Sequence, residues 1–182
     1  MRTFPPLFFR SICTSLVQFT VISMAWLAPL AWADVYDDVY DDVERLIRNG
    51  QYERASEQSN ARLKTAPNDP QMRLLRSRIL DAQGKTGEAV GVLESLTLEF
   101  PELPEPHNNL AVLLARQGRT QEAIASLNKA LLARPDYSVA LENLGDLHLG
   151  LALQAYQRAG QTLAAPASAT RKASAIAPLL QR

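Results

Sequence analysis

The side chains that most often perform catalysis or bind metals are scarce in this sequence. Its 182 residues include two histidines, His107 and His148, and a single cysteine, Cys13. Neither histidine has a cysteine or a second histidine at the spacing that zinc sites use. A Ser-His-Asp arrangement has no fixed spacing and stays open, but the sequence contains no Gly-x-Ser-x-Gly motif and no phosphate-binding glycine loop. We therefore expect a protein that is not an enzyme and that uses no metal or cofactor.

The acidic run DVYDDVYDDVE, from Asp34 to Glu44, offers carboxylates of the kind that calcium accepts. A calcium loop needs a glycine turn among its oxygen ligands, and this run has none. Its valines instead recur at helical spacing. Asp37 and Asp38 also suit the positive end of a helix dipole. The run is therefore interpreted as the beginning of a helix.

Glycines, alanines and prolines recur along the chain with a spacing of 34 residues. The glycines are Gly50, Gly84 and Gly118, the alanines Ala55, Ala89 and Ala123, and the prolines Pro67, Pro101 and Pro135. Such a spacing is typical of helix–turn–helix solenoids. One unit cannot bury its apolar face alone, so the units stack and present an elongated curved surface.

Each unit is expected to hold two helices separated by a glycine turn. The units lie near residues 36–69, 70–103 and 104–137, with an atypical one at 138–165. Glycine ends the first helix because it adopts positive φ without strain, and proline stops the second. Asp69, before Pro70, is expected to cap the next helix.

These residues resemble the tetratricopeptide repeat family. Its pattern has a small residue at position 8, glycine at 15, alanine at 20, a bulky residue at 24, a small one at 27 and proline at 32. The third unit matches it throughout, with Ala111, Gly118, Ala123, Leu127, Ala130 and Pro135. The second has Leu96 at position 27. The first, with Ser59 and Arg62 at positions 24 and 27, is interpreted as a cap.

The resemblance implies an all-α, right-handed solenoid of about three to four helix–turn–helix repeats with a long C-terminal capping helix. The family places core aromatics at positions 4 and 11, where this sequence has His107 and His148. Both histidines are therefore expected to pack in the core.

The fourth unit departs from the pattern. Gly145 falls at position 8, but only seven steps separate it from Ala152 where the family has twelve, so the turn glycine is missing. We predict one continuous helix from about Val139 to beyond Ala159. Residues 166–182 have no strong pattern and are expected to form a flexible tail, or at most a short helix.

The segments RNGQYERA, PELPEPHNNLAVLLARQG and ALENLGDLHLGLALQAYQRA also resemble a narrower group of exported bacterial tetratricopeptide proteins. In longer members of that group, this region precedes a small domain of the nuclear-transport-factor-2-like kind, related to L,D-transpeptidases. The resemblance covers residues 42–159 and leaves no room for that domain before Arg182. Its activity is therefore not expected here.

In the tetratricopeptide family, the first helices of the units line a concave face that binds partners. The matching residues are Tyr40, Glu44, Leu74, Arg78, Asn108, Asn109, Val112, Arg116, Glu142, Asn143 and Asp146. In some members, asparagines spaced like Asn109 and Asn143 grip the backbone of an extended peptide, since an amide both donates and accepts. Asp41 and Leu75 interrupt such a ladder here. Arg78 and Arg116 are expected to meet an acidic group on a partner.

The N-terminal 33 residues have the features of a secretory signal peptide. Arg2 and Arg10 give a basic start without acidic residues, and the run from Ile12 to Leu30 is largely apolar. Ala31-Trp32-Ala33 is a small-x-small cleavage site, which predicts cleavage before Asp34.

The alternative for this segment is an uncleaved inner-membrane anchor over residues 12–32, since the apolar run approaches the about 20 residues of a membrane span. Cleavage removes the only cysteine and leaves 149 residues with a net charge of −2, enough for one domain. No basic patch of the density that nucleic acid requires is present. We expect an exported, periplasmic protein that meets the membrane only transiently, through its signal.

Three hypotheses about function follow. The first is a non-catalytic adaptor that binds a protein or extended peptide segment during cell-envelope assembly or maintenance. The second is the recognition subunit of a split cell-wall enzyme, which binds a separate catalytic partner or peptidoglycan. The third is homo-oligomerisation through an open end of the solenoid.

Overall fold

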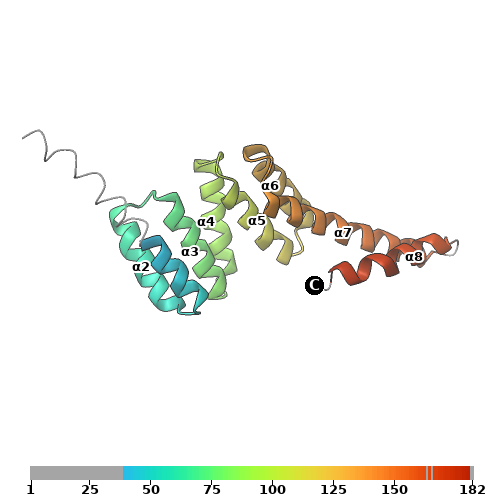
Figure 1. Cartoon of the computed structure of the whole chain (residues 1–182), viewed down its shortest axis with the longest axis horizontal. Coiled ribbons are helices and arrows are strands. Elements are labelled where there is room, and N and C mark those ends of the chain that lie inside the picture. The colour runs from blue at the N-terminus through green and yellow to red at the C-terminus, as the bar shows by residue number, and fades with distance from the viewer. Residues whose placement is uncertain (1–38, 163, 165, 181–182) are drawn as a thin grey trace, which may run out of the picture.

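The computed structural model describes residues 39–162, 164 and 166–180, and the elements in this part of the chain are helices joined by short turns. The helix of residues 39–48 pairs with α2 (Tyr52–Thr65). The second hairpin consists of α3 (Pro70–Ala82) and α4 (Thr86–Glu99), and the third of α5 (Pro104–Arg116) and α6 (Thr120–Ala133). The hairpins stack in chain order (Figure 1). The all-α solenoid predicted from the sequence is thus confirmed, while the predicted signal peptide lies outside the described residues.

The three turns inside the hairpins have one geometry. Gly50, Gly84 and Gly118 adopt φ of 70°, 79° and 76°. In the second turn, the amide of Lys85 donates to the carbonyl of Leu80 at 2.8 Å, and the amide of Gly84 to that of Asp81 at 2.9 Å. This is the Schellman arrangement, which satisfies carbonyls that the helix end leaves free. A Cβ on any of the three glycines would meet nothing within 4 Å, so positive φ alone requires glycine there.

The cap predicted for the second hairpin is confirmed. Asp69 precedes α3, and its side chain accepts a hydrogen bond from the amide of Met72 at 3.0 Å. Pro70 occupies the first turn, where its missing N–H is not needed. The same carboxylate also accepts hydrogen bonds from the Tyr40 hydroxyl at 2.7 Å and the Arg62 guanidinium at 2.9 Å. One capping residue therefore ties the first hairpin to the second.

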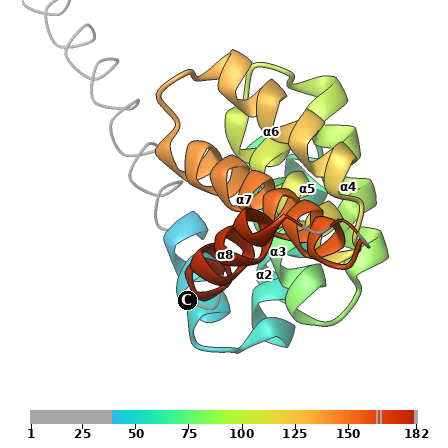
Figure 2. The same ribbon diagram turned by 90° about the vertical axis from the view of Figure 1, so that its right-hand side faces the viewer.

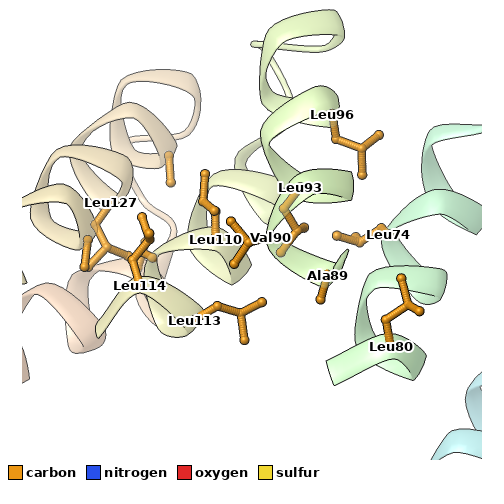
Figure 3. Packing of buried hydrophobic residues seen from close by; sticks show 14 residues of the cluster. Leu74, Leu80, Ala89, Val90, Leu93, Leu96, Leu110, Leu113, Leu114 and Leu127 are labelled. Carbon is orange, nitrogen blue, oxygen red and sulfur yellow. The ribbon is translucent and has the colours of Figure 1, made fainter. Parts of the chain in front are cut away.

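Small residues occupy the close helix crossings, as predicted. Ala55, Ala89 and Ala123 are fully buried, and Ala111 is 1% exposed. Leucines fill the space between the hairpins: Figure 3 shows Leu93 of α4 lying among side chains of the neighbouring helices. A larger side chain at any of these alanines would clash with its neighbours, because protein interiors are close-packed.

A single long helix, α7 (Ser138–Gly160), follows the third hairpin, and the continuous helix predicted for this region is confirmed. It buries only Ala140 fully, whereas α5 and α6 bury most of their apolar face. Beyond it, α8 (Ala167–Ile176) and the short 3₁₀ helix η1 (Ala177–Leu180) occupy the region where the sequence suggests a flexible tail or at most a short helix.

α8 turns back along the far half of α7 (Figure 1). The ammonium of Lys172 lies 5.1 Å from the ring centroid of Tyr156, so a cation–π contact joins the two helices. Viewed from this end, α7 and α8 lie in front of the stacked hairpins (Figure 2).

The two histidines, both expected in the core, have different surroundings. His107 is 3% exposed, and its Nε2 lies 3.3 Å from the carbonyl oxygen of Pro101. His148 on α7 is exposed, so the packing prediction is wrong for this residue. The reason is that α7 continues straight on, and no second helix of a fourth hairpin covers position 11. Gly145 is exposed for the same reason, and a Cβ there would meet nothing within 4 Å.

Candidate functional site

Polar contacts join the first helix of each hairpin to the next along the face that the sequence predicts as concave. A guanidinium nitrogen of Arg78 on α3 lies 3.3 Å from a carboxylate oxygen of Glu44. The corresponding distance between Arg116 on α5 and Asp81 on α3 is 2.6 Å. Asn143 on α7 donates to the amide oxygen of Asn108 on α5 at 2.9 Å. The partners in each pair are 34 or 35 residues apart, so the contacts follow the repeat and link all four first helices.

These ion pairs orient side chains more than they stabilise the fold. The side chains of Arg116 and Asp81 are 56% and 22% exposed. Pairs this accessible to water contribute about 0–1 kcal/mol. The pair between Arg116 and Asp81 was missed from the sequence, because Asp81 at position 12 was not among the predicted site residues. A sequence signal for this pair exists, because Asp81 and Arg116 carry opposite charges and lie about one repeat apart.

The asparagines are arranged differently from a simple ladder. Asn108 is only 4% exposed, so it is not available to a partner as the sequence suggests. Its amide oxygen accepts from Asn143, and its amide nitrogen lies 3.4 Å from the oxygen of Asn109. Asn109 and Asn143 are partly exposed. Within the part of the chain that the structure describes, the Asn109 amide nitrogen has no acceptor. Asn108 therefore positions the two asparagines that face outward.

Tyr40, a predicted binding residue, has its hydroxyl engaged in the network around Asp69. Burial of the ring and the hydrogen bond to Asp69 raise the pKa of Tyr40 above its ordinary value. For Asp69, burial alone would raise the pKa, but hydrogen bonds from Tyr40, the Met72 amide and Arg62 outweigh it and lower the pKa. This end of the face is fixed by structural contacts.

Two small pockets open between successive first helices. The first has a volume of about 190 Å³ and is lined by Ser77, Arg78, Asp81, Leu93, Asn109, Val112 and Leu113. The second has a volume of about 200 Å³ and is lined by Ala111, Val112, Ala115, Arg116, Leu127, Asn143, Asp146 and Leu147. Val112 is 38% exposed and lines both. The structure thus brings Arg78, Asn109, Val112, Arg116, Asn143 and Asp146 together around two pockets that the sequence does not reveal. That these residues bind a partner stays a prediction.

Charged side chains lie at both ends of this face. Near the first hairpin, Arg48 and Arg78 share Glu44, with distances of 3.3 Å each. The exposed Asp41, on the same helix as Glu44, supplies a second negative charge, so the charges at this end balance. At the α7 end, Glu142 and Asp146 are exposed, and neither forms an ion pair within the described residues. An excess of negative charge is therefore found at the α7 end of the face.

A larger hollow, of about 580 Å³, lies where α2, α3 and α4 meet, and its lining includes Leu63, Arg73 and Glu88. No group of three or more histidine, cysteine, aspartate or glutamate side chains lies close enough to hold a metal ion among these residues. Burial lowers the pKa of His107, and its Nδ1 has no hydrogen-bond partner in the structure. None of the described helices is both long and apolar enough to span a bilayer.

Comparison with known sequence families matches two overlapping segments. Residues 40–104 and residues 80–144 each match a model of the tetratricopeptide repeat. Together the two segments span more than half of the chain and cover the described helices from residue 40 to the first part of α7. A comparison with curated proteins finds no match to this chain.

Solved structures share the fold. A tetratricopeptide repeat protein from Parabacteroides merdae superposes with a TM-score of 0.54 at 20% identity, covering 80% of this chain and 65% of that one. A chain from the structure of Naa15/Naa10 bound to HypK-THB superposes with a TM-score of 0.57 at 19% identity, covering 79% of this chain and 22% of that one. The chain thus spans about two thirds of the length of the Parabacteroides merdae protein and about a fifth of the length of the chain from the Naa15/Naa10 structure.

Proposed function

This chain belongs to the tetratricopeptide repeat family, and from that premise we propose that it is an exported, periplasmic adaptor that holds an extended segment of another protein in cell-envelope assembly or maintenance. The repeats indicate a protein–protein interaction scaffold, and the fold is typically non-catalytic. The surface assigned to the partner is the face formed by α3, α5 and the first half of α7.

The observation that carries the proposal is the pair of pockets on either side of Val112. Both open on the face built by the first helices, and Asn109 and Asn143 each line one of them. An apolar pocket with a few polar groups is the usual form of a recognition site. Stacked helices hold these groups in place before a partner arrives, which lowers the entropic cost of binding.

The test is a pull-down from periplasmic extract with the mature chain, compared with an Asn109→Ala, Asn143→Ala, Arg116→Ala triple variant. The matched control replaces two amides and a cation on the exposed surface of α6, Gln121→Ala, Asn128→Ala and Lys129→Ala. Circular dichroism melting checks that all three proteins are folded. We expect the groove variant to lose partners that the control keeps. Identical partner sets for the two variants would remove this face from the proposal.

Export is tested separately. Expression of the full chain in a Gram-negative host, followed by mass spectrometry of the purified protein, is expected to give an N-terminus at Asp34 in the periplasmic fraction. Recovery of the intact chain in the inner-membrane fraction would favour the anchor over residues 12–32 instead.

A further inference from the structure

The far half of α7 carries the residues with which the second helix of a hairpin packs on the first. In the third hairpin these residues hold positions 20, 24 and 27 and are fully buried: Ala123, Leu127 and Ala130. The residues of α7 with the same spacing are Ala152, Tyr156 and Ala159. α7 thus contains both helices of a fourth repeat, fused into one because the connection between them is five residues shorter than in the family.

The first half of α7 has no helix packed over it in the way that α6 packs over α5. In the third hairpin, the residues at positions 4, 7, 8 and 11 are at most 8% exposed: His107, Leu110, Ala111 and Leu114. At the same positions of α7, Leu141 is 50% exposed, and Gly145 and His148 are exposed as well. Because a continuous helix cannot fold back on itself, the second half of α7 cannot cover the first half of the same α7.

Both packing faces lie on one side of α7. The residues concerned alternate at spacings of four and three: Leu141, Gly145, His148, Ala152, Ala155 and Ala159. We call these six residues the α7 seam. Their spacing keeps them on one face of a helix and is the spacing with which the helices of a coiled coil meet. The charged residues of α7, which are Glu142, Asp146 and Arg158, fall outside it.

α8 packs beside the seam and leaves it open (Figure 1). Thr170 lies next to Gly160, and Lys172 lies over the ring of Tyr156. Ala155 and Ala159 line a separate hollow of about 330 Å³, and no residue of α8 takes part in that lining. All six seam residues are accordingly exposed or partly exposed.

We infer that two copies of this chain pair through the α7 seam, antiparallel and about a two-fold axis. The first half of each α7 then packs against the second half of the other, as α5 packs against α6. Each pair completes a fourth repeat from two chains. The single chain, with its seam exposed, is the form that remains on dilution. This pairing goes beyond the proposed function and does not depend on it.

The third hairpin supplies the register of the pairing. The Ser126 hydroxyl donates to the carbonyl oxygen of His107 at 2.9 Å, which fixes how far α5 and α6 are shifted along each other. Nearer the turn, Ala111 and Ala123 belong to the same buried cluster, at the close crossing of the two helices. Positions 8 and 20 therefore face each other in a complete repeat.

The same two positions in α7 are Gly145 and Ala152. In the dimer, Gly145 of one copy faces Ala152 of the other, and the reverse contact follows from the symmetry. The two-fold axis passes midway between these positions, between His148 and Leu149. Glycine and alanine at both contacts let the two helices approach closely, as the paired alanines do in the third hairpin.

A second copy is the occupant that satisfies the whole seam at once. A two-fold interface brings the same surface of both chains together, so that surface has to be complementary to itself. The α7 seam meets this condition because one helix carries both sets of repeat positions. The seam covers about 27 Å of helix, and the dimer forms the helix contact of the third hairpin twice, in continuity with the stack.

Disulfide crosslinking tests the register, because the mature chain from Asp34 has no cysteine. Gly145→Cys and Ala152→Cys should each fail to crosslink alone, since like positions lie about 10 Å apart along the helix axis, too far for a disulfide. A mixture of the two variants should form a disulfide-linked dimer on mild oxidation. His148→Cys, next to the axis, should crosslink by itself. Gln154→Cys, outside the seam, is the control and should give no dimer on a non-reducing gel.

Restoring the turn should turn the dimer into a monomer. A copy of residues 115–119, Ala-Arg-Gln-Gly-Arg, inserted between His148 and Leu149 returns the fourth unit to the spacing of the third. The second half can then fold onto the first half of its own chain. Sedimentation equilibrium should give twice the mass of one chain for the wild type and the mass of one chain for this variant, and circular dichroism checks that both are helical. Seven alanines inserted at the same place keep the helix continuous and the seam in phase, so this control should remain a dimer.

A charge placed in the seam provides the mildest test. Ala155→Glu adds one carboxylate to the seam, and Gln154→Glu adds one on the neighbouring exposed position outside it. Ala155→Glu should weaken dimerisation at least about tenfold, because the pairing would bury an unpaired charge. Gln154→Glu should leave the dissociation constant within about twofold of the wild type.

Three results would overturn the inference. They are a wild-type chain that sediments as a monomer at every concentration tested, crosslinking of Gly145→Cys alone as efficient as that of the mixture, and a dimer that survives both the restored turn and Ala155→Glu. The pull-down that tests the groove uses other residues, so either proposal can fail while the other stands.

Discussion

The third hairpin and the C-terminal helices begin with the same sequence pattern and end as different structures. In the third hairpin, Gly118 reverses the chain, and α6 covers the apolar face of α5. In the fourth unit, the turn is missing, and α7 continues for 23 residues without reversing. Ala111 is consequently buried, while Gly145 at the same repeat position is exposed. The comparison shows that a residue in a repeat is buried only when a turn reverses the chain and a second helix packs over it. The residue type alone does not determine burial.

The largest effect is expected from overfilling the third hairpin. Ala123 is fully buried at the crossing of α5 and α6, so Ala123→Phe should lower the free energy of unfolding by about 3 kcal/mol. Ala125→Phe, two residues on and exposed, should change it by less than about 0.5 kcal/mol. Urea denaturation measures both. Equal midpoints for the two variants would contradict the packing described for this hairpin.

Replacing glycine by alanine should change the free energy of unfolding in opposite directions in the two regions. Gly118 has a φ of 76°, and an L-residue in that conformation costs about 1–2 kcal/mol. Gly145 lies inside a helix with nothing within 4 Å of a new Cβ, so Gly145→Ala should stabilise α7 by up to about 1 kcal/mol. Thermal melting should show a lower melting temperature than wild type for Gly118→Ala and a higher one for Gly145→Ala. If Gly145→Ala destabilised the protein as Gly118→Ala does, α7 would have to bend or pack differently from its structure.

The cation–π contact between α7 and α8 should stabilise the C-terminal helices without affecting the stacked hairpins. A cation–π pair at an exposed site contributes about 0.5–1 kcal/mol, and Lys172→Met removes the one between Lys172 and Tyr156. We expect faster amide hydrogen exchange in α8, with exchange in α5 unchanged. Arg171→Met, which removes the neighbouring exposed cation, is the control. Accelerated exchange in α5 would mean that the two regions unfold together.

The smallest effect concerns the two histidines. Burial lowers the pKa of His107. Below the ordinary histidine pKa of about 6.5, the unfolded chain therefore takes up a proton before the folded one does. Stability contributed by His107 is present above that pH and is lost as the pH falls towards the lower, folded-state pKa. Urea midpoints between pH 7.5 and 5.5 should fall less steeply for His107→Phe than for the wild type.

His148→Phe provides the matched control for that measurement, since His148 is exposed on α7. Its urea midpoints should follow the wild-type pH dependence over the same range. If the pH dependence disappeared in His148→Phe and persisted in His107→Phe, the assignment of the pH-dependent stability to His107 would be wrong.

The sequence by itself determined the features that each segment encodes locally. Three local features could be predicted because each requires a particular residue type. They are the glycine that must adopt positive φ, the carboxylate before a proline at a helix start, and the alanine at a helix crossing. The missing turn glycine likewise predicted the uninterrupted α7. The repeat then fixed the fold, because a hairpin with an apolar flank has to stack on another.

Only the tertiary structure decided what the groove consists of. The pockets and the pairing of Arg116 with Asp81 require side chains about 34 residues apart to meet across neighbouring helices. Asn108 looked in the sequence like the other predicted binding residues, but in the structure it is buried and supports Asn109 and Asn143. His148 occupied a core position, but no helix came to cover it. Burial is a property of what lies opposite a side chain, and the chain specifies that only after its helices have packed.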